Sequence, residues 1–162
     1  MRRIRLLALT VIASAPVLAA RAAPCPPPAT FEVTALQSEL MVLATACGDR
    51  EGYNDFMRRY QPYLLRTERE LQTWFNRSYG RGGLSAHDRF VTDLANAQSD
   101  EGVAQGTDFC PRNATLFSEV MALQRSAQLP DYAAGKALVP PGVATCVVTA
   151  AAPKRRILRR RR

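Results

Sequence analysis

Residues 30–48 read TFEVTALQSELMVLATACG, and this stretch decides the fold. Its apolar side chains recur at steps of three and four positions, at Val33, Leu36, Leu40, Leu43 and Cys47. That spacing places them along one face of an α-helix. Thr30 can cap the start of this helix, and Gly48 can end it in a left-handed conformation. We therefore predict a helix with one buried face and a cysteine in its last turn.

A second and longer helix is predicted over residues 50–79. Its apolar stripe consists of Phe56, Tyr60, Tyr63, Leu64, Leu71, Trp74 and Phe75. Pro62 interrupts the pattern, because a proline inside a helix removes one backbone hydrogen bond and clashes with the preceding turn. We expect either a kink near Gln61 or two abutting helices.

The rest of the chain predicts two further helices. Three glycines at 80, 82 and 83 end the second helix, and Ser85 to Asp88 resembles a capping box for a third helix over about 86–104. A fourth helix is expected from Pro111 to about Gln128, where Leu129-Pro130 would stop it. Together these patterns predict an all-α bundle of about four helices with short antiparallel connections. The bundle domain would span residues 31–130, followed by an irregular segment over 131–153.

The N-terminus has the organisation of a secretory signal peptide over residues 1–22. Three arginines in the first five residues precede a run of 15 mostly apolar residues, and Ala20-Arg21-Ala22 has the small-x-small pattern of a cleavage site. The run is shorter than the roughly 20 residues that a membrane span needs. We therefore expect a periplasmic or secreted protein whose mature chain has no transmembrane segment. Residues 23–30 would form a proline-rich stalk.

The four cysteines all lie after the signal peptide, at Cys25, Cys47, Cys110 and Cys146. In an exported chain they are expected to form two disulfides, for which three connectivities are possible. Cys47 ends the first predicted helix and Cys110 precedes the fourth, which makes them natural partners. Cys25 and Cys146 would then join the stalk to the C-terminal segment. With one histidine and no Cys-x-x-Cys pair, the sequence predicts neither a metal site nor a redox centre, and no cofactor.

The positive charge of the chain is concentrated at its two ends. Residues 23–153 contain 11 basic and 14 acidic residues, so this body has a net charge of −3 and is unlike a nucleic-acid-binding domain. The predicted disordered tail, residues 154–162, carries seven positive charges, at Lys154, Arg155, Arg156, Arg159, Arg160, Arg161 and Arg162. Such a tail attracts polyanions such as lipid headgroups, lipopolysaccharide or cell-wall polymers. The alternative is a solubilising tail without a specific partner.

Three groups of residues suggest chemistry, but each has a simpler structural interpretation. Ser85, His87 and Asp88 contain the residue types of a catalytic triad, yet neighbours at a helix start face different directions, and an exposed histidine in a capping segment is favoured. The acidic pairs also resemble solvated helix surface rather than the two acids of a glycosidase, because the members of each pair are too close in sequence to share a helix face: Glu68 with Glu70, and Asp100 with Glu101.

Two further patterns could bind anions or rings. The glycine-rich turn at 80–83 lies near Arg77 and Arg81 and offers backbone N–H groups, although a plain interhelical turn is favoured. Seven of the twelve aromatic residues fall between Tyr53 and Tyr79, interleaved with arginines that could support stacking on bases or sugars. Their helical spacing favours core packing, and Tyr53 and Tyr79 are the two expected to be exposed.

One resemblance covers roughly residues 36–123. The motifs Leu40-Met41-Val42, Cys47-Gly48, Tyr53-Asn54, Arg89-Phe90-Val91-Thr92, Leu94-Ala95-Asn96 and Phe109-Cys110 resemble a group of uncharacterised small exported helical proteins of alphaproteobacteria. The group has no established activity, so the resemblance transfers no catalytic residue. It implies that Cys47 and Cys110 belong to the domain itself, whereas Cys25, Cys146 and the basic tail lie outside the matched region.

These observations favour a non-enzymatic function. We expect an exported, disulfide-stabilised helical binding protein of the cell envelope, whose basic tail attracts an anionic surface and whose partner is an envelope protein or that surface. The alternative is a small periplasmic stress chaperone or an inhibitor of an envelope enzyme, as other small disulfide-bonded helical scaffolds are. An enzyme such as a wall-lytic hydrolase is the least favoured interpretation.

Overall fold

The computed structural model of the chain describes residues 28–140 and 143, and within them every regular element is a helix. The predicted all-α class is therefore confirmed. Three short 3-10 turns, Gly80–Gly82, Gly106–Asp108 and Ser126–Gln128, connect the α-helices. The α-helices are α1 (Pro28–Cys47), α2 (Arg50–Tyr79), α3 (Gly83–Gln105), α4 (Phe109–Asn113), α5 (Leu116–Ala122) and α6 (Leu129–Lys136).

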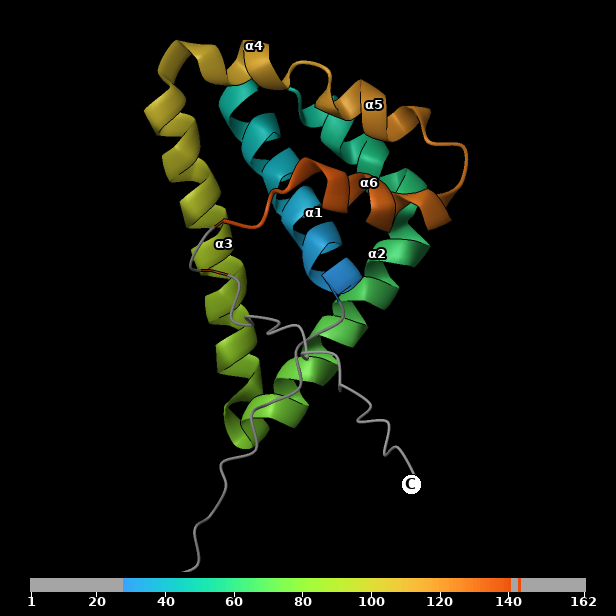
Figure 1. Ribbon diagram of the computed structural model, residues 1–162, viewed down its shortest axis with the longest axis vertical. Helices are drawn as coiled ribbons and strands as arrows, with labels where there is room; N and C mark the ends of the chain where they lie inside the picture. Colours follow the sequence, from blue (N-terminus) through green and yellow to red (C-terminus); the bar gives the residue numbers. More distant parts are fainter. Residues whose placement is uncertain (1–27, 141–142, 144–162) are drawn as a thin grey trace, which may run out of the picture.

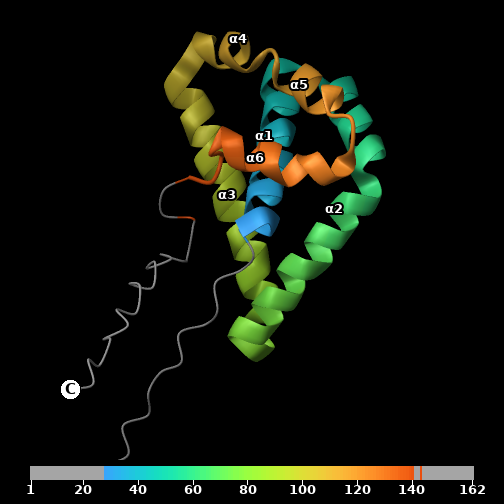
Figure 2. The same ribbon diagram turned by 45° about the vertical axis from the view of Figure 1, so that its right-hand side comes forward.

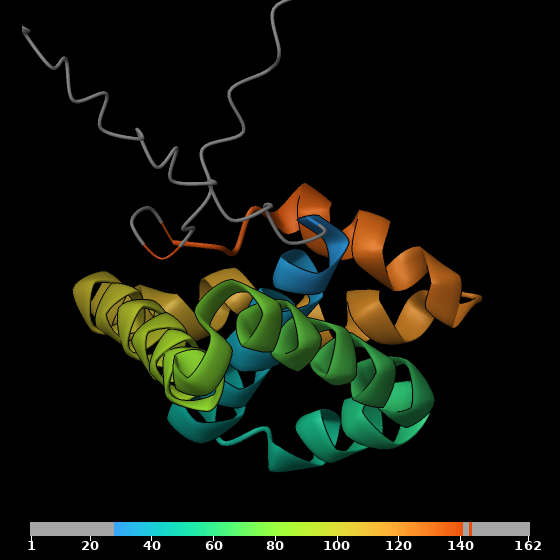
Figure 3. The ribbon, with the colours of Figure 1, turned by 90° about the horizontal axis from the view of Figure 1, so that it is seen from below.

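The two longest helices form a V. Helices α2 and α3 are its arms, and they meet at the turn Gly80–Gly82 (Figure 1). Helix α1 lies between the arms, and α6 crosses α1 on one side (Figures 2 and 3). Helices α4 and α5 cover the open end of the V, where α1 ends. This arrangement makes α1 the central helix of the domain.

The buried side chains of α1 surround the helix rather than forming only the predicted stripe. Val33, Leu36 and Leu40 are completely buried in one core cluster, while Phe31 and Ala35 are buried in a second. Buried side chains on more than one face of a helix mean that other elements enclose it. The single buried face predicted for residues 30–48 was therefore too narrow, because it took account of only one of the two clusters.

The first core cluster lies towards the open end of the V. It joins α1 to the first half of α2 and to α4, α5 and α6, with Phe56 and Tyr60 among its largest fully buried side chains. The Tyr60 hydroxyl donates a hydrogen bond of 2.6 Å to the carbonyl oxygen of Val120, in the last turn of α5. The same carbonyl also accepts a longer backbone hydrogen bond, of 3.4 Å, from the Leu123 N–H that follows α5. The tyrosine therefore supplies the shorter of its two hydrogen bonds, at a helix end where carbonyls lack intrahelical donors.

The second core cluster is aromatic and lies nearer the tip of the V. Phe31 of α1 packs edge-on against Trp74 of α2, with ring centroids 5.8 Å apart, and lies 4.8 Å from Phe90 of α3. Phe75 also contacts both Trp74 and Phe90. Aromatic pairs in such tilted and edge-on geometries are favoured by their ring quadrupoles. The start of α1 is thus held between the two arms.

Pro62 lies inside α2, which is one uninterrupted helix from Arg50 to Tyr79. The alternative of two abutting helices is therefore wrong. Figures 1 and 2 show the axis of α2 changing direction in its first half, which contains Pro62. The two halves of α2 face different parts of the core, since Phe56 belongs to the first cluster and Phe75 to the second.

Two predicted helix starts require correction, and one predicted helix end is confirmed. Helix α1 begins at Pro28, so Thr30 is not its cap; its hydroxyl instead donates to a Glu70 carboxylate oxygen at 3.2 Å. Helix α3 begins at Gly83 with Gly82 as its N-cap, which places Ser85 to Asp88 inside the helix rather than in a capping box. Gly48 follows α1 with a φ of +81°, the left-handed conformation predicted for it.

The predicted fourth helix over 111–128 is divided into α4, α5 and a 3-10 turn. Leu123 ends α5 in an extended conformation with a ψ of 130°. Pro130 was predicted to stop a helix, but it lies in the first turn of α6, where a proline lacks no needed hydrogen bond. Residues 131–136, predicted to be irregular, therefore belong to α6.

Several predictions concern residues outside the described ranges. These are the signal peptide at 1–22, most of the stalk, Cys25, Cys146 and the tail from Lys154 to Arg162. Among the helices of residues 28–140, none is both long and apolar enough to cross a bilayer.

The hydrogen bond between Tyr60 and Val120 gives a stability prediction. Tyr60→Phe keeps the ring in the core but leaves the Val120 carbonyl oxygen without this donor. We expect the free energy of unfolding to fall by about 1–2 kcal/mol, as when one partner of a buried hydrogen bond is removed. Urea denaturation followed by circular dichroism measures this change. Tyr79→Phe, at a side chain 49% exposed, is the matched control and should change stability by less than about 0.5 kcal/mol.

Candidate functional site

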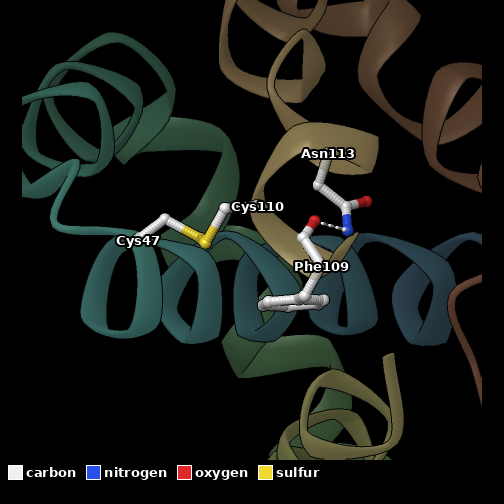
Figure 4. Close-up of a disulfide and its surroundings, with 4 residues drawn as sticks. All are labelled: Cys47, Phe109, Cys110 and Asn113. Atoms are coloured by element: carbon white, nitrogen blue, oxygen red, sulfur yellow. Dashed lines mark hydrogen bonds between the residues drawn. A yellow bond between two sulfur atoms is a disulfide. The ribbon is translucent and has the colours of Figure 1, made fainter. Parts of the chain in front are cut away.

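A disulfide joins the end of α1 to α4. Cys47 and Cys110 are bonded with their Cα atoms 5.7 Å apart, which is the pairing that their sequence positions suggested. Figure 4 shows the bond beside Phe109, the residue before Cys110, and the ring of Phe109 is buried. Asn113 closes the short helix α4, because its side-chain amide donates to the Phe109 carbonyl oxygen at 2.9 Å. The disulfide and Phe109 thus fix α4 against the end of α1.

A groove lies next to this disulfide, between the C-terminal halves of α1 and α3. Its volume is about 490 Å³, within the usual range for ligand pockets. The lining contains no charged side chain and consists of Met41, Val42, Thr45, Ala46, Ala95, Asn96, Ser99, Gly102, Val103, Gly106, Phe109 and Cys110. Val103 is 80% exposed and Met41 is 42% exposed, so two large apolar side chains border the groove and face solvent.

Glycines at the end of α3 shape this groove. A Cβ atom on Gly102 would lie 3.2 Å from the Phe109 ring, so a glycine allows the ring to pack directly against α3. Gly106, with a φ of +56°, ends α3 and turns the chain towards α4. The position of α4 beside the groove therefore depends on the backbone conformation of these glycines as well as on the disulfide.

The groove presents a few hydrogen-bonding side chains among apolar ones. Its polar side chains are Thr45, Asn96 and Ser99, and the Thr45 hydroxyl already donates to the Met41 carbonyl oxygen at 2.9 Å. None of these side chains titrates near neutral pH. The groove offers an apolar surface with a few hydrogen-bonding groups, which suits an apolar side chain or segment of a partner.

Polar residues occupy the middle of the α1–α3 interface. The Gln98 amide donates to the carbonyl oxygens of Ala35, at 2.9 Å, and Leu138, at 3.2 Å, so it links α3 to α1 and to the segment after α6. Glu39 of α1 is buried here, and burial raises the pKa of its carboxyl to about 7, with a further contribution from the negative charge of Glu101. The Gln105 amide donates to that Glu101 carboxylate at 3.1 Å.

His87 is buried, contrary to the predicted exposed histidine. Its Nε2 lies 2.9 Å from a Glu68 carboxylate oxygen of α2, its Nδ1 lies 3.4 Å from Asp88, and its ring packs edge-on against Phe75. It therefore connects the two arms of the V. Ser85 is exposed on α3, and no contact brings its hydroxyl to the histidine among the interactions that the structure records.

The acidic pairs have separate partners. Glu68 contacts His87, whereas Glu70 accepts a hydrogen bond from Thr30. Glu101 accepts from Gln105, and its neighbour Asp100 is exposed. Their separate surroundings support the structural interpretation of these carboxylates as helix-surface and interface groups.

The aromatic residues of α2 pack mostly in the core, as their spacing indicated. Tyr79 is half exposed, as predicted, but Tyr53 is only partly exposed and packs against the first core cluster. In the glycine-rich turn predicted at 80–83, Gly80–Gly82 form a 3-10 turn that joins the arms of the V, and Gly83 begins α3.

One polar cluster was missed because its members come from different helices. Glu119 of α5 accepts hydrogen bonds from Lys136, Tyr132 and Thr115. The Lys136 ammonium is the main cause that lowers the pKa of Glu119 to about 2, with Thr115 and Tyr132 contributing. Burial and the hydrogen bond to Glu119 raise the pKa of Tyr132. The cluster fastens α6 to α5, and sequence spacings of 13 and 17 residues gave no sign of it.

The described residues hold no group of three or more histidine, cysteine or acidic side chains placed to bind a metal ion. No protein-family model matches this chain, and no curated protein or solved structure matches it either.

The disulfide gives the second prediction. Replacing Cys47 and Cys110 together by serine removes a crosslink between residues 63 positions apart. The entropy of closing such a loop corresponds to about 4 kcal/mol of stability. Urea denaturation of the oxidised variant, with Cys25 and Cys146 unchanged, should show a loss of this size. A loss below about 1 kcal/mol would contradict a stabilising role for the bond.

Glu39 gives a prediction about pH. Its pKa of about 7 in the folded state exceeds the ordinary value of 4.5. The unfolded state therefore loses this proton more readily, and the folded state becomes less stable as the pH rises from about 4.5 to 7. Glu39→Gln should therefore raise the unfolding midpoint at pH 8 and change it little at pH 4.5. Thermal unfolding at both values tests this. The control Asp100→Asn, at an exposed carboxylate, should show no comparable dependence on pH.

Proposed function

We propose that this protein is an exported, non-enzymatic binding protein of the cell envelope, and that it holds an apolar segment of a partner in the groove between α1 and α3. The observation that carries the proposal is the groove itself: an open apolar hollow of about 490 Å³ without charged lining, bordered by exposed Met41 and Val103. Exposed apolar side chains gathered at a concave surface are typical of interaction sites.

An oxidising compartment is supported by the disulfide. Structural disulfides persist in exported proteins and are rare in the cytosol. The signal-peptide pattern of residues 1–22 agrees with export to the periplasm or beyond. We further propose that Cys25 and Cys146 form a second disulfide, which would tie the segment before α1 to the segment that follows α6.

The basic tail would bring the protein to an anionic surface. Each of its seven positive charges contributes about 1 kcal/mol near such a surface at low salt. In this proposal the tail determines where the protein is located, and the groove determines which partner it binds. Nucleic acid is not proposed as a partner of the helical body, whose net charge of −3 opposes it.

A chaperone or inhibitor remains the second candidate. Met41 at the edge of the groove favours it, because a flexible thioether side chain adapts to varied apolar partners. A chaperone would suppress the aggregation of several unfolded envelope proteins, whereas a binding protein with one partner would not.

The groove gives the fourth prediction. A photo-crosslinking amino acid placed at Val103 should capture a discrete partner from envelope extract, because this side chain borders the groove. The same group at Leu65, another exposed apolar position on α2, is the matched control and should capture none. Met41→Asp should abolish capture from Val103 by placing a charge at the edge of the neutral groove. Equal capture from both positions, or capture that survives Met41→Asp, would contradict the proposal.

A further inference from the structure

The turn at the tip of the V carries arginines and no acidic residue of its own. From Leu71 in α2 to His87 in α3 the sequence reads LQTWFNRSYGRGGLSAH, which contains no aspartate or glutamate. The neighbouring carboxylates of Glu68 and Asp88 contact His87. Arg77 and Arg81 are both exposed within this stretch. The helical body has a net negative charge as a whole, so the positive charge of this tip is a local property.

Two large apolar side chains face solvent at the same tip. Leu84, in the first turn of α3, is 59% exposed, and Tyr79, the last residue of α2, is 49% exposed. The Tyr79 ring is held in place from beneath, stacked on Phe75 at 5.8 Å and edge-on to Trp74 at 6.2 Å. An anchored tyrosine with one exposed side, beside an exposed leucine, is the combination found at membrane–water interfaces.

The positive face continues along α2 beside the tip. A shallow hollow of about 410 Å³ is lined there by Arg66, Arg69 and Arg77, together with Glu70, Thr73 and Trp74. The Glu70 carboxylate already accepts the hydrogen bond from Thr30, and the Arg66 guanidinium lies over the Tyr63 ring at 5.0 Å. Three guanidinium groups thus border one hollow that contains a single carboxylate.

The chain reaches this part of the molecule shortly before its basic tail. Val143 lines a small hollow with Phe75, Tyr79 and Phe90 near the tip of the V. Lys154, the first residue of the tail, follows 11 residues later, which is at most about 40 Å of extended chain. The seven charges of the tail and the arginines of the tip are therefore able to meet the same surface.

We propose that the tip of the V is a docking surface for a bilayer rich in anionic lipid. Leu84 and Tyr79 enter the interface, and Arg77 and Arg81 pair with lipid phosphate groups. An exposed leucine distinguishes this from binding to nucleic acid or a soluble polyanion, because burial of Leu84 is favourable only where the partner offers an apolar phase. The inference rests on the proposed function only in placing the protein in the envelope.

The test is a co-sedimentation experiment, in which the oxidised protein without residues 1–22 is mixed with lipid vesicles. One set contains phosphatidylcholine alone, and the other contains one-third phosphatidylglycerol. Leu84→Ser is compared with Leu65→Ser, which removes a leucine of similar exposure from the middle of α2. Arg77→Gln and Arg81→Gln are compared with Arg112→Gln on α4. Replacing all seven tail cations by glutamine tests the tail separately. Circular dichroism verifies that each variant is folded.

The wild-type protein should bind the anionic vesicles and not the neutral ones. Leu84→Ser should weaken binding about tenfold, and each tip arginine variant about fivefold, while the Leu65 and Arg112 controls remain within about twofold. If Leu84→Ser and Leu65→Ser bind the anionic vesicles equally well, the inference is overturned. A second outcome also overturns it: the arginine variants weaken binding, Leu84→Ser does not, and heparin or DNA displaces the protein from the vesicles. The tip would then be a general site for polyanions.

The tail variant separates this inference from the proposed function. If it loses binding while the tip variants retain it, the tip is not the docking surface and the tail alone acts. If the tip variants lose binding and the tail variant retains it, the docking surface is supported and the proposed role of the tail fails. Loss of binding in both kinds of variant supports a shared surface.

Discussion

The enclosure of α1 between the arms of the V is the constraint on which the rest of the structure depends. Helices α2, α3, α4 and α6 all contact it, and both core clusters include its side chains. Because Leu36 and Leu40 are completely buried, removing α1 would expose the inner faces of the helices that enclose it. The short helices α4 to α6 are too short to be stable alone, so they depend on the surface that α1 and α2 provide.

The position of α1 also explains why the two ends of the molecule differ. Its last turn carries Cys47, so the disulfide, α4 and the apolar groove all gather at the open end of the V. At the tip, beyond the start of α1, the described residues leave Tyr79 and Leu84 exposed near Arg77 and Arg81. A neutral apolar surface at one end and a basic amphipathic surface at the other would allow partner binding and surface docking at the same time.

The sequence predicts those parts of the fold that depend on local spacing. The spacing of apolar residues in 33–43 and 50–79 was sufficient to predict helices α1 and α2, and Gly48 was sufficient to predict where α1 ends. Helices α5 and α6 depend on contacts between distant residues, such as Tyr60 with Val120 and Glu119 with Lys136, which no local pattern reveals. Pro130 was misread for the same reason, because a proline before a helix and one after it look alike until packing is known. The groove could not be predicted, since its lining comes from three separate segments, although the disulfide beside it could.

Native-state hydrogen exchange tests the central role of α1 most directly. The free energy of opening should be highest for the amides of α1 between Leu36 and Leu43, where exchange should require global unfolding, and lower for α5 and α6. Exchange from the middle of α1 at a lower opening free energy than from α2 and α3 would show that the arms hold together without it. That result would contradict the account of α1 as the helix around which the domain is built.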